Sequence, residues 1–214
     1  MLLKALRVLP NIEKTIQVFL KKEIANSRKE ILEILIKYII GKIENNKQVN
    51  LNFICTHNSR RSQFCQIWSS TASQYYNIPV NCYSGGTEIT ECNKRVIKSI
   101  INNGFLVTGN DKNKNPEYLV AISANKTIKL FSKLFKKSIN NDRTFIAVMT
   151  CSDADKNCPY IPGAEKRISL KYDDPKEFDN TALEIKKYEE CSYKIASEIF
   201  YVFNEVSKKL SFIN

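Results

Sequence analysis

The residues with the clearest chemical potential form one short run, Cys55-Thr56-His57-Asn58-Ser59-Arg60-Arg61-Ser62. Residues 51–54 before it are mostly apolar and predict a buried strand, and the polar residues after it predict a helix. A loop that leads from a strand into a helix gathers backbone N–H groups around one point, where the helix dipole adds positive potential. We therefore expect this run to form a cradle for an oxyanion.

The run opens with a cysteine, whose thiolate is the reactive form. In such a cradle we expect Cys55 to ionise easily and to act as a nucleophile. Arg61 can return its planar guanidinium group to the same point and hold a tetrahedral oxyanion with two hydrogen bonds. Ser62 can donate its hydroxyl to the thiolate. The alternative interpretation makes Cys55 a buried residue at a strand end and Arg61 a solvated helix residue.

The composition suits a folded α/β protein. The chain has 214 residues, 43% of them hydrophobic, with six glycines and six prolines, which argues against disorder. No run of eighteen apolar residues exists and the first residues are too interrupted for a secretory signal, so we expect neither a membrane span nor export. Seven cysteines without compact spacing favour free thiols in a reducing cytoplasm. A single histidine and the absence of two close cysteine pairs argue against zinc, and we expect no metal and no cofactor.

The net charge of +11 is compatible with nucleic acid, an anionic surface or anionic substrates. Many of the positive charges are lysines spread through predicted helices, without an arginine-rich stripe interleaved with aromatic residues. This distribution favours a solvated basic surface over a nucleic-acid interface.

Apolar periodicity predicts helices that alternate with strands. The segment Asn11–Lys47 reads as two helices, with a capping box from Ser27 to Glu30 at the start of the second. Further helices are predicted at about 60–76, 91–103 and 181–210, and strands at Val49–Ile54, Val80–Tyr83 and Thr144–Met149. Ser84-Gly85-Gly86-Thr87 should turn sharply beside the cradle, and Gly104 suits a helix C-terminus.

The region 113–141 has a different sequence pattern, with short segments typical of strands. Tyr118–Ile122 and Thr127–Phe131 predict a β-hairpin, with a helix over Ile128–Lys137 as the competing interpretation. Strands alternating with helices imply a parallel sheet covered on both faces, with the site at the carboxyl ends of its strands. Cys55 and Cys151 both fall at such ends. We predict an N-terminal helical extension (1–48), packed on the core or on a second subunit, and an α/β domain (49–214) that contains the insertion 113–141.

With these residues assembled, the chain resembles the low-molecular-weight protein-tyrosine-phosphatase superfamily, and within it the thioredoxin-coupled arsenate reductases. The resemblance runs from about Val49 to the C-terminus. Phosphatases and reductases share the pattern Cys-x5-Arg-Ser. The more specific signal is Cys151-Ser-Asp-Ala-Asp-x2-Cys158-Pro, followed by Asp173-Asp174-Pro175. The resemblance implies a four-stranded parallel sheet with flanking helices.

The resemblance also implies roles. Cys55 would attack the oxyanion, which Arg61 and the backbone amides of 56–62 would hold, and Asp174 would protonate the leaving oxygen. Cys151 would then attack the sulfur of the Cys55 adduct, and Cys158 would attack Cys151, leaving a disulfide for a thioredoxin-like reductant. The alternative interpretations assign structural roles only: Asp173 and Asp174 begin a turn, and Cys151 and Cys158 are buried packing residues.

The spacing of Cys151 and Cys158 carries a geometric prediction. Seven residues of intact helix separate two Cα atoms by about 10 Å, whereas a disulfide requires about 4.4–6.8 Å. The segment 151–158 must therefore be a loop, or a helix that unwinds during the cycle.

Two positions depart from related loops, which often have Gly at the position of His57 and Cys at that of Arg60. His57 either adjusts the charge of the thiolate or faces solvent, and Arg60 adds positive charge near the mouth. Four other cysteines are interpreted as packing residues: Cys65, Cys82, Cys92 and Cys191.

Three functions compete. The first is reduction of arsenate through Cys55, Cys151 and Cys158. The second is a phosphatase that uses a cysteinyl-phosphate intermediate and does not need the last two thiols; an aromatic slot built from Trp68, Tyr118 or Tyr160 would favour it. The third is a non-catalytic module that binds anions or nucleic acid. The expected partners are a small oxyanion and a thioredoxin-like reductant, and the N-terminal helices suit a homodimer.

Overall fold

The computed structural model describes residues 7–109, 113–139, 143–158 and 160–211. Residues 1–6 of the predicted extension, the end of the predicted insertion and Pro159 lie outside these ranges. Within the described residues, no helix is long and apolar enough to cross a membrane.

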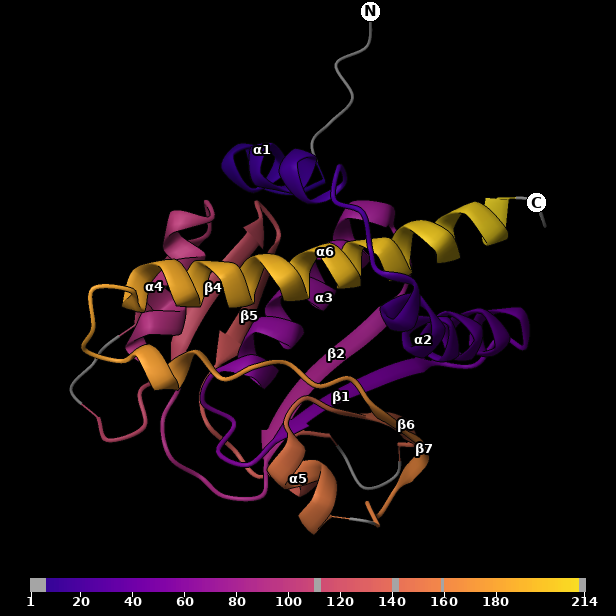
Figure 1. The fold of residues 1–214 in the computed structure, drawn as a ribbon. Coiled ribbons are helices and arrows are strands. Elements are labelled where there is room, and N and C mark those ends of the chain that lie inside the picture. Colours follow the sequence, from indigo (N-terminus) through magenta and orange to yellow (C-terminus); the bar gives the residue numbers. More distant parts are fainter. Residues whose placement is uncertain (1–6, 110–112, 140–142, 159, 212–214) are drawn as a thin grey trace, which may run out of the picture.

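Four parallel strands form the central sheet (Figure 1). Their order is β2 (Val80–Gly86), β1 (Val49–Cys55), β6 (Phe145–Met149) and β7 (Ala164–Ser169). Every residue of the central strands β1 and β6 is buried, as expected of parallel strands covered on both faces. The predicted four-stranded parallel sheet is confirmed.

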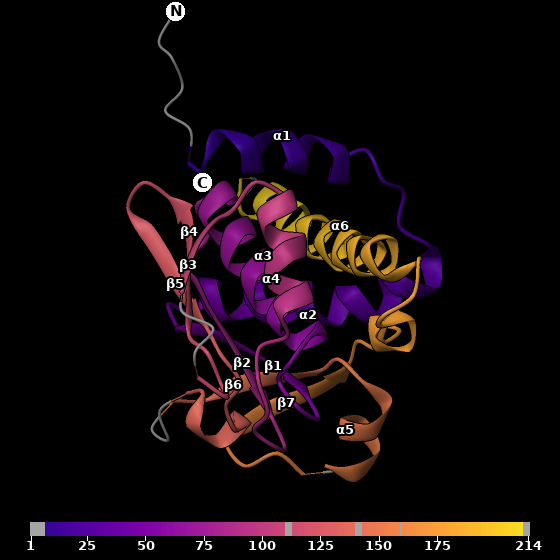
Figure 2. The ribbon, with the colours of Figure 1, turned by 90° about the vertical axis from the view of Figure 1, so that its left-hand side faces the viewer.

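The two faces of the sheet carry separate apolar clusters because side chains alternate along each strand. Leu51 and Phe53 of β1 join the larger cluster, together with residues of α2 (Asn26–Glu44), α3 (Arg61–Tyr76) and α6 (Glu184–Ser211). Ile54 points to the other face and joins the smaller cluster, under α5 (Ser152–Asn157) and the short 3-10 helix η1 (Phe135–Lys137). Cys55 also belongs to the smaller cluster, at the end of β1 where the regular alternation stops. Figure 2 shows the long helices on one side of the sheet and α5 on the other.

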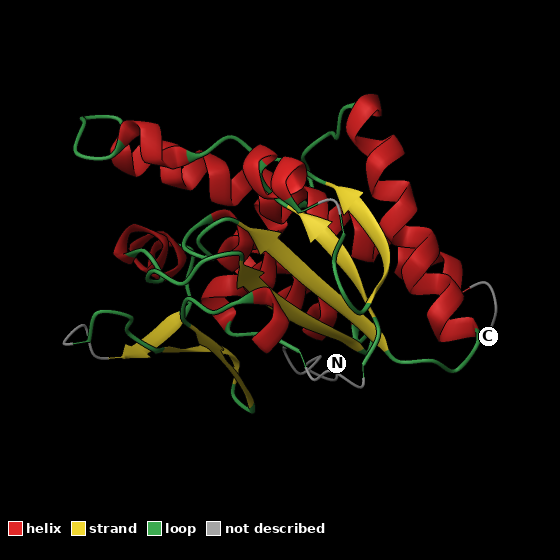
Figure 3. Cartoon of the chain, turned by 90° about the horizontal axis from the view of Figure 1, so that it is seen from below, coloured by secondary structure: helices red, strands yellow, loops and turns green. Residues whose placement is uncertain are grey.

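The predicted hairpin is correct, and it belongs to a second sheet. Strands β3 (Leu106–Gly109), β4 (Tyr118–Ser123) and β5 (Lys126–Leu130) pair antiparallel in that order. Figure 3 shows this sheet standing apart from the four parallel strands. Only η1 remains of the competing helix over 128–137, because residues 128–130 pair with β4.

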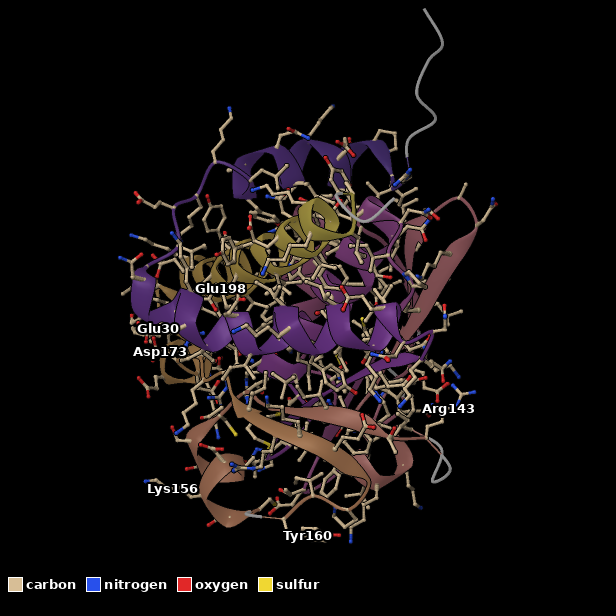
Figure 4. The ribbon with its side chains drawn as sticks, turned by 90° about the vertical axis from the view of Figure 1, so that its right-hand side faces the viewer. Glu30, Arg143, Lys156, Tyr160, Asp173 and Glu198 are labelled. Carbon is tan, nitrogen blue, oxygen red and sulfur yellow. The ribbon has the colours of Figure 1, made fainter. Side chains whose placement is uncertain are left out.

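The N-terminal helices pack on the α/β core. Helix α1 (Pro10–Phe19) buries Phe19, whose ring meets Trp68 edge-on with centroids 4.9 Å apart. Arg28 of α2 forms an ion pair with Glu198 of α6, N–O distance 2.6 Å, and Figure 4 shows Glu198 between the two helices. These contacts bury the apolar faces of both helices within the chain.

Two local predictions are wrong. The N-cap of α2 is Ala25, and no side chain caps this helix, because Asn26 is already helical and the N–H groups of Arg28 and Lys29 bond to the Ala25 carbonyl. The predicted turn at 84–87 is instead the end of β2, which stays paired with β1 as far as Gly86. Helix α4 (Lys94–Asn102) ends two residues before Gly104, whose φ of +96° fits the predicted position just after the helix C-terminus.

Candidate active site

Cys55 is the last residue of β1 and lies inside the loop that leads to α3. Its side chain is 5% exposed. The Sγ atom lies 3.1 Å from the Ser62 hydroxyl and accepts the backbone N–H of Asn58, also at 3.1 Å. The Asn58 side-chain amide donates to the Ser62 oxygen at 2.9 Å, which leaves the Ser62 proton free to point at the sulfur. Ser62 is therefore positioned to stabilise a thiolate.

The Cys55 thiol is harder to ionise than the sequence led us to expect. Burial raises its pKa, while the hydrogen bond to Ser62 and the charge of Arg61 lower it. Burial is the larger effect because the side chain is almost completely enclosed and loses the solvation of its charged form. Enclosure of Cys55 therefore opposes its ionisation, while Ser62 and Arg61 favour it.

Donors outside the loop hold the carbonyl groups of residues 56–59. The Thr56 carbonyl accepts from Glu88 N–H, and the Ser59 carbonyl from Asn93 N–H. The His57 carbonyl accepts the Ser132 hydroxyl, and the Asn58 carbonyl accepts the Gln63 side-chain amide. Because a peptide carbonyl and the N–H of the following residue point in opposite directions, these bonds turn the loop N–H groups inward. This network fixes the loop backbone, and inward N–H groups are the feature of an anion-binding concavity.

Gly86 allows the loop to lie close against β2. A Cβ atom at this position would lie 2.6 Å from the carbonyl oxygens of both Thr56 and Glu88, and 2.8 Å from the Asn58 nitrogen. Asn58 itself takes a positive φ of 47°, a conformation that asparagine tolerates better than most residues. The loop thus depends on a glycine beneath it and an asparagine within it.

Arg61 links the loop to residues 172–174. One terminal nitrogen donates to the Tyr172 carbonyl at 2.9 Å, and the other to the Asp174 carboxylate at 2.5 Å. Asp174 also accepts the N–H of Lys176 and begins the 3-10 helix η2 (Pro175–Phe178). The structure therefore brings Asp174 close to the cradle, although Asp174 and Arg61 are 113 positions apart in the chain. The bond from Lys176 N–H is also the turn-forming contact that the alternative interpretation expects.

The two unusual loop residues turn outward. The Arg60 guanidinium donates to the Tyr188 hydroxyl at 2.9 Å and lies 3.7 Å from Asp179, so its charge is matched by α6 and the segment before it. The His57 side chain is 45% exposed and lies 3.4 Å from Glu88. This position matches the solvent-facing interpretation of His57.

Cys151 lies beside the same loop because β1 and β6 are neighbours and end at the same edge of the sheet. Cys151 is 1% exposed, and its Sγ atom lies 3.6 Å from the hydroxyl of Thr56, the residue that follows Cys55. The sulfur also accepts the Ala154 N–H as the N-cap of α5. Cys158 is partly buried at the other end of this helix, against the same apolar cluster.

Asp155 anchors α5 to β7. Its carboxylate accepts bonds from Arg167, from the Ser169 hydroxyl at 2.8 Å and from Lys171 at 2.8 Å. Arg167 also donates to the Asp155 carbonyl, so both the side chain and the backbone of the helix are held. Although burial opposes it, these bonds lower the pKa of Asp155.

A cavity of about 390 Å³ adjoins Asp174, between residues 172–178 and α6. Its aromatic lining residues are Tyr172 and Phe178, and none of the three residues suggested for a slot lines it. Trp68 and Tyr118 are buried in the core, and Tyr160 is 78% exposed on the α5 side of the molecule (Figure 4).

The remaining cysteines agree with a packing role. Cys65, Cys92 and Cys191 are buried, Cys82 is half-buried, and all seven cysteines are free. Across the described ranges, no group of three histidine, cysteine or acidic residues is arranged to hold a metal ion.

Sequence reasoning missed the residues that hold the loop and α5 from outside. Gln63, Ser132 and Lys133 act through tertiary contacts, and no motif marks them. Asp155 lies within the motif that begins at Cys151, but the sequence predicted no role for it. The one sequence signal for these contacts was the acidic residue Asp155 in the middle of the segment 151–158, because a half-buried carboxylate requires a hydrogen-bond donor or a positive charge beside it.

Known proteins resemble this chain. No family model matches it. "Arsenate reductase 2" of Staphylococcus haemolyticus (strain JCSC1435) is 30% identical over 139 residues, which cover 63% of this chain and 88% of the relative. "Arsenate reductase" of Staphylococcus aureus (strain Newman) is 32% identical over 139 residues, with the same coverage. A solved structure described as "An arsenate reductase in the phosphate binding state" is 13% identical, covers 74% of this chain and 99% of its own, and has a TM-score of 0.44.

Proposed function

The chain belongs to the arsenate reductase branch of the low-molecular-weight protein-tyrosine-phosphatase superfamily, and from this premise we propose that it reduces arsenate to arsenite with Cys55, Cys151 and Cys158. The observation that carries the proposal is the placement of Cys151 beside Thr56, within the smaller apolar cluster that also contains Cys55. A phosphatase mechanism has no use for a second buried thiol at this point.

In the first step the Cys55 thiolate attacks arsenic and forms a sulfur–arsenic bond. A hydroxyl of arsenate leaves as water after receiving a proton, and Asp174 is the proposed donor because Arg61 holds it beside the cradle. Arg61 and the N–H groups of residues 56–62 would bind the remaining oxygens.

In the second step the Cys151 thiolate attacks the Cys55 sulfur. A Cys55–Cys151 disulfide forms, the sulfur–arsenic bond breaks, and its electron pair stays on arsenic, which leaves as arsenite. Cys158 then attacks the Cys151 sulfur and releases the Cys55 thiolate. A thioredoxin-like dithiol would supply two electrons to the Cys151–Cys158 disulfide. Seven free cysteines favour a reducing compartment, and we place the reaction in the cytoplasm.

The second candidate is hydrolysis of a phosphate ester with Cys55, Arg61 and Asp174. The cavity next to Asp174, with Phe178 in its wall, favours this alternative because it offers room for the organic part of an ester. The N-terminal helices give less support to a homodimer, since Ile12, Ile16 and Phe19 are buried inside this chain.

Disulfide mapping tests the proposal. The fully reduced protein is treated with arsenate, without an external reductant, and its disulfides are identified by mass spectrometry. We expect Cys151–Cys158 in the wild type and a trapped Cys55–Cys151 bond in Cys158→Ser. Cys82→Ser is the matched control, because this half-buried thiol lies outside the relay. Absence of any arsenate-dependent disulfide, together with Cys55-dependent release of phosphate from an aryl phosphate, would favour the phosphatase.

A further inference from the structure

Lys133 lies where the second sheet meets the anion loop. Residues 131–134 lead from β5 to η1. The Lys133 N–H donates to the Asn58 side-chain oxygen at 3.1 Å, and the Lys133 carbonyl accepts from Gly86 N–H at 2.8 Å. The backbone of Lys133 is thereby fixed to the residue that touches both Cys55 and Ser62.

The Lys133 side chain turns inward, toward neutral groups. Its ammonium nitrogen lies 3.4 Å from the Ser84 hydroxyl, 3.2 Å from the Phe131 carbonyl and 4.5 Å from the centre of the Phe131 ring. Ser84 donates its own proton to Gln66 and so offers a lone pair to the ammonium. In the described part of the chain, no carboxylate forms an ion pair with Lys133. Among the residues described, its positive charge therefore has no acidic partner.

A partly buried cation without an acidic partner is unfavourable, because it loses solvation that neutral neighbours replace only in part. Burial lowers the pKa of Lys133 to about 8, which is the expected response to this environment. The neighbouring groups from β2, α3 and the segment before α4 are Ser84, Gln66 and Cys92. Cys92 stays neutral because burial raises its pKa to about 12. None of these neighbours supplies a negative charge.

A negative charge in the anion loop would act as the counter-charge of Lys133. Ser84 precedes by two residues Gly86, the strand partner of Cys55, and lies on the same face of β2. This places the ammonium about 10 Å or less from the cradle, at a depth where charges are weakly screened. An anion in the cradle, or a thiolate at Cys55, would relieve the unfavourable burial of the Lys133 charge.

We propose that Lys133 is a positioning residue and built-in cation of the oxyanion site, which strengthens binding of tetrahedral dianions and favours the Cys55 thiolate from beneath the loop. This inference shares one assumption with the proposed function, namely that the loop binds an oxyanion. It requires neither Cys151 nor Cys158.

The experiment compares Lys133→Met, which removes the charge, with Lys133→Arg, which keeps it. Lys136→Met is the matched control, because Lys136 is an exposed lysine three residues further on. Binding of inorganic phosphate to the reduced protein is measured by calorimetry at pH 7. The pKa of Cys55 is measured from the pH dependence of its alkylation by iodoacetamide, with the modified cysteine identified by peptide mass spectrometry. Thermal unfolding checks the fold.

We expect Lys133→Met to weaken phosphate binding about tenfold and to raise the pKa of Cys55 by about one unit. Lys133→Arg and Lys136→Met should stay near wild type. Unchanged phosphate affinity and an unchanged Cys55 pKa in folded Lys133→Met would overturn the proposal, as would an equal loss in Lys136→Met.

A second measurement avoids dependence on the stability of Lys133→Met. In Cys55→Ser, which removes the titrating thiol, phosphate affinity is followed from pH 8 to pH 9.5, where the ligand remains a dianion. The affinity should fall as Lys133 loses its proton, and it should fall less in Cys55→Ser/Lys133→Arg. Identical pH profiles for these two proteins would also overturn the proposal. Because arsenate-dependent disulfides are scored separately in the wild type, failure of the relay and failure of this inference are distinguishable.

Discussion

Cys151 and Cys158 lie at the two ends of one short helix, Cys151 as the N-cap of α5 and Cys158 as its C-cap. With this helix intact, their Cα atoms are separated by about 10 Å, too far for a disulfide. Of the two arrangements that the spacing allowed, the structure has the helix that must unwind. The proposed relay therefore includes a conformational step, and Asp155 opposes it by tying α5 to β7.

We predict that Asp155→Asn accelerates formation of the Cys151–Cys158 disulfide several-fold. The substitution keeps the size of the side chain but removes the charge that holds Arg167 and Lys171. Quenched-flow alkylation after addition of arsenate gives the rate, and hydrogen exchange of residues 152–158 reports the opening of the helix. Asp153→Asn is the control, since Asp153 is exposed on the same helix. Equal rates in both variants would contradict the role given to Asp155.

Acid should loosen the same anchor. The pKa of Asp155 is lowered in the folded protein, so its stabilising effect is complete above the ordinary carboxyl pKa and is lost as the pH falls through the lowered value. We expect hydrogen exchange in α5, corrected for intrinsic rates, to increase below about pH 4 in the wild type. In Asp155→Asn it should already be high at neutral pH and change little with acid.

We predict that Ser62→Ala raises the pKa of Cys55 by about one unit, because it removes a hydrogen bond to the thiolate. The thiolate is the active form, so the acidic limb of the pH profile of kcat/KM should move to higher pH. Ser69→Ala is a matched control on the same helix, because the Ser69 hydroxyl is buried without a hydrogen-bond partner. A shift of equal size in both variants would remove Ser62 from the mechanism.

We predict that Asp174→Asn lowers the release of phosphate from an aryl phosphate about 100-fold, the effect of losing a general acid. Asp173→Asn serves as control, because the Asp173 side chain is fully exposed and its nearest basic partner, Lys194, is 3.9 Å away. If Asp174→Asn lowers thermal stability while the rate stays within a few-fold of wild type, the turn-forming role of Asp174 is the correct one.

We predict that Gly86→Ala destabilises the protein by about 2 kcal/mol and lowers activity about 100-fold. The added Cβ would meet backbone atoms of the loop at 2.6–2.8 Å, and these atoms can retreat only by displacing the cradle. Gly41→Ala is the contrasting control, because nothing lies within 4 Å of its added Cβ in helix α2. It should stabilise the protein by about 0.5–1 kcal/mol. Chemical denaturation measures both changes.

The fold was predictable where a short segment is rich in apolar residues. Strands β1 and β6 are buried along their whole length, so their sequences are apolar enough to identify. Strand β7 has the sequence AEKRIS, with only Ile168 buried, and strand β3 has four residues, none of them buried. Neither strand carries a clear period of two. Their pairing partners, not their own residues, determine that they are strands.

The local geometry of the candidate site was predictable, and its electrostatics less so. The run from Cys55 to Ser62 indicated a strand, a loop and a helix because a nucleophile in a cradle requires that order. The ionisation of Cys55 was misjudged because it depends on enclosure by residues from β6, η1 and α5, which the local sequence does not contain. Lys133 was missed for the same reason: in the sequence it is one lysine among many.

Residues 131–134 connect the β3–β5 sheet to the anion loop. Ser132 and Lys133 bond to the anion loop, and Leu134 pairs with Gly86, so this segment belongs functionally to the loop although it continues directly from β5. The β3–β5 sheet also contributes Tyr118, Val120, Ile122 and Leu130 to the larger core. A change in the length of this sheet would therefore have to preserve two things at once, this packing and the position in which the chain delivers residues 131–134 to the loop.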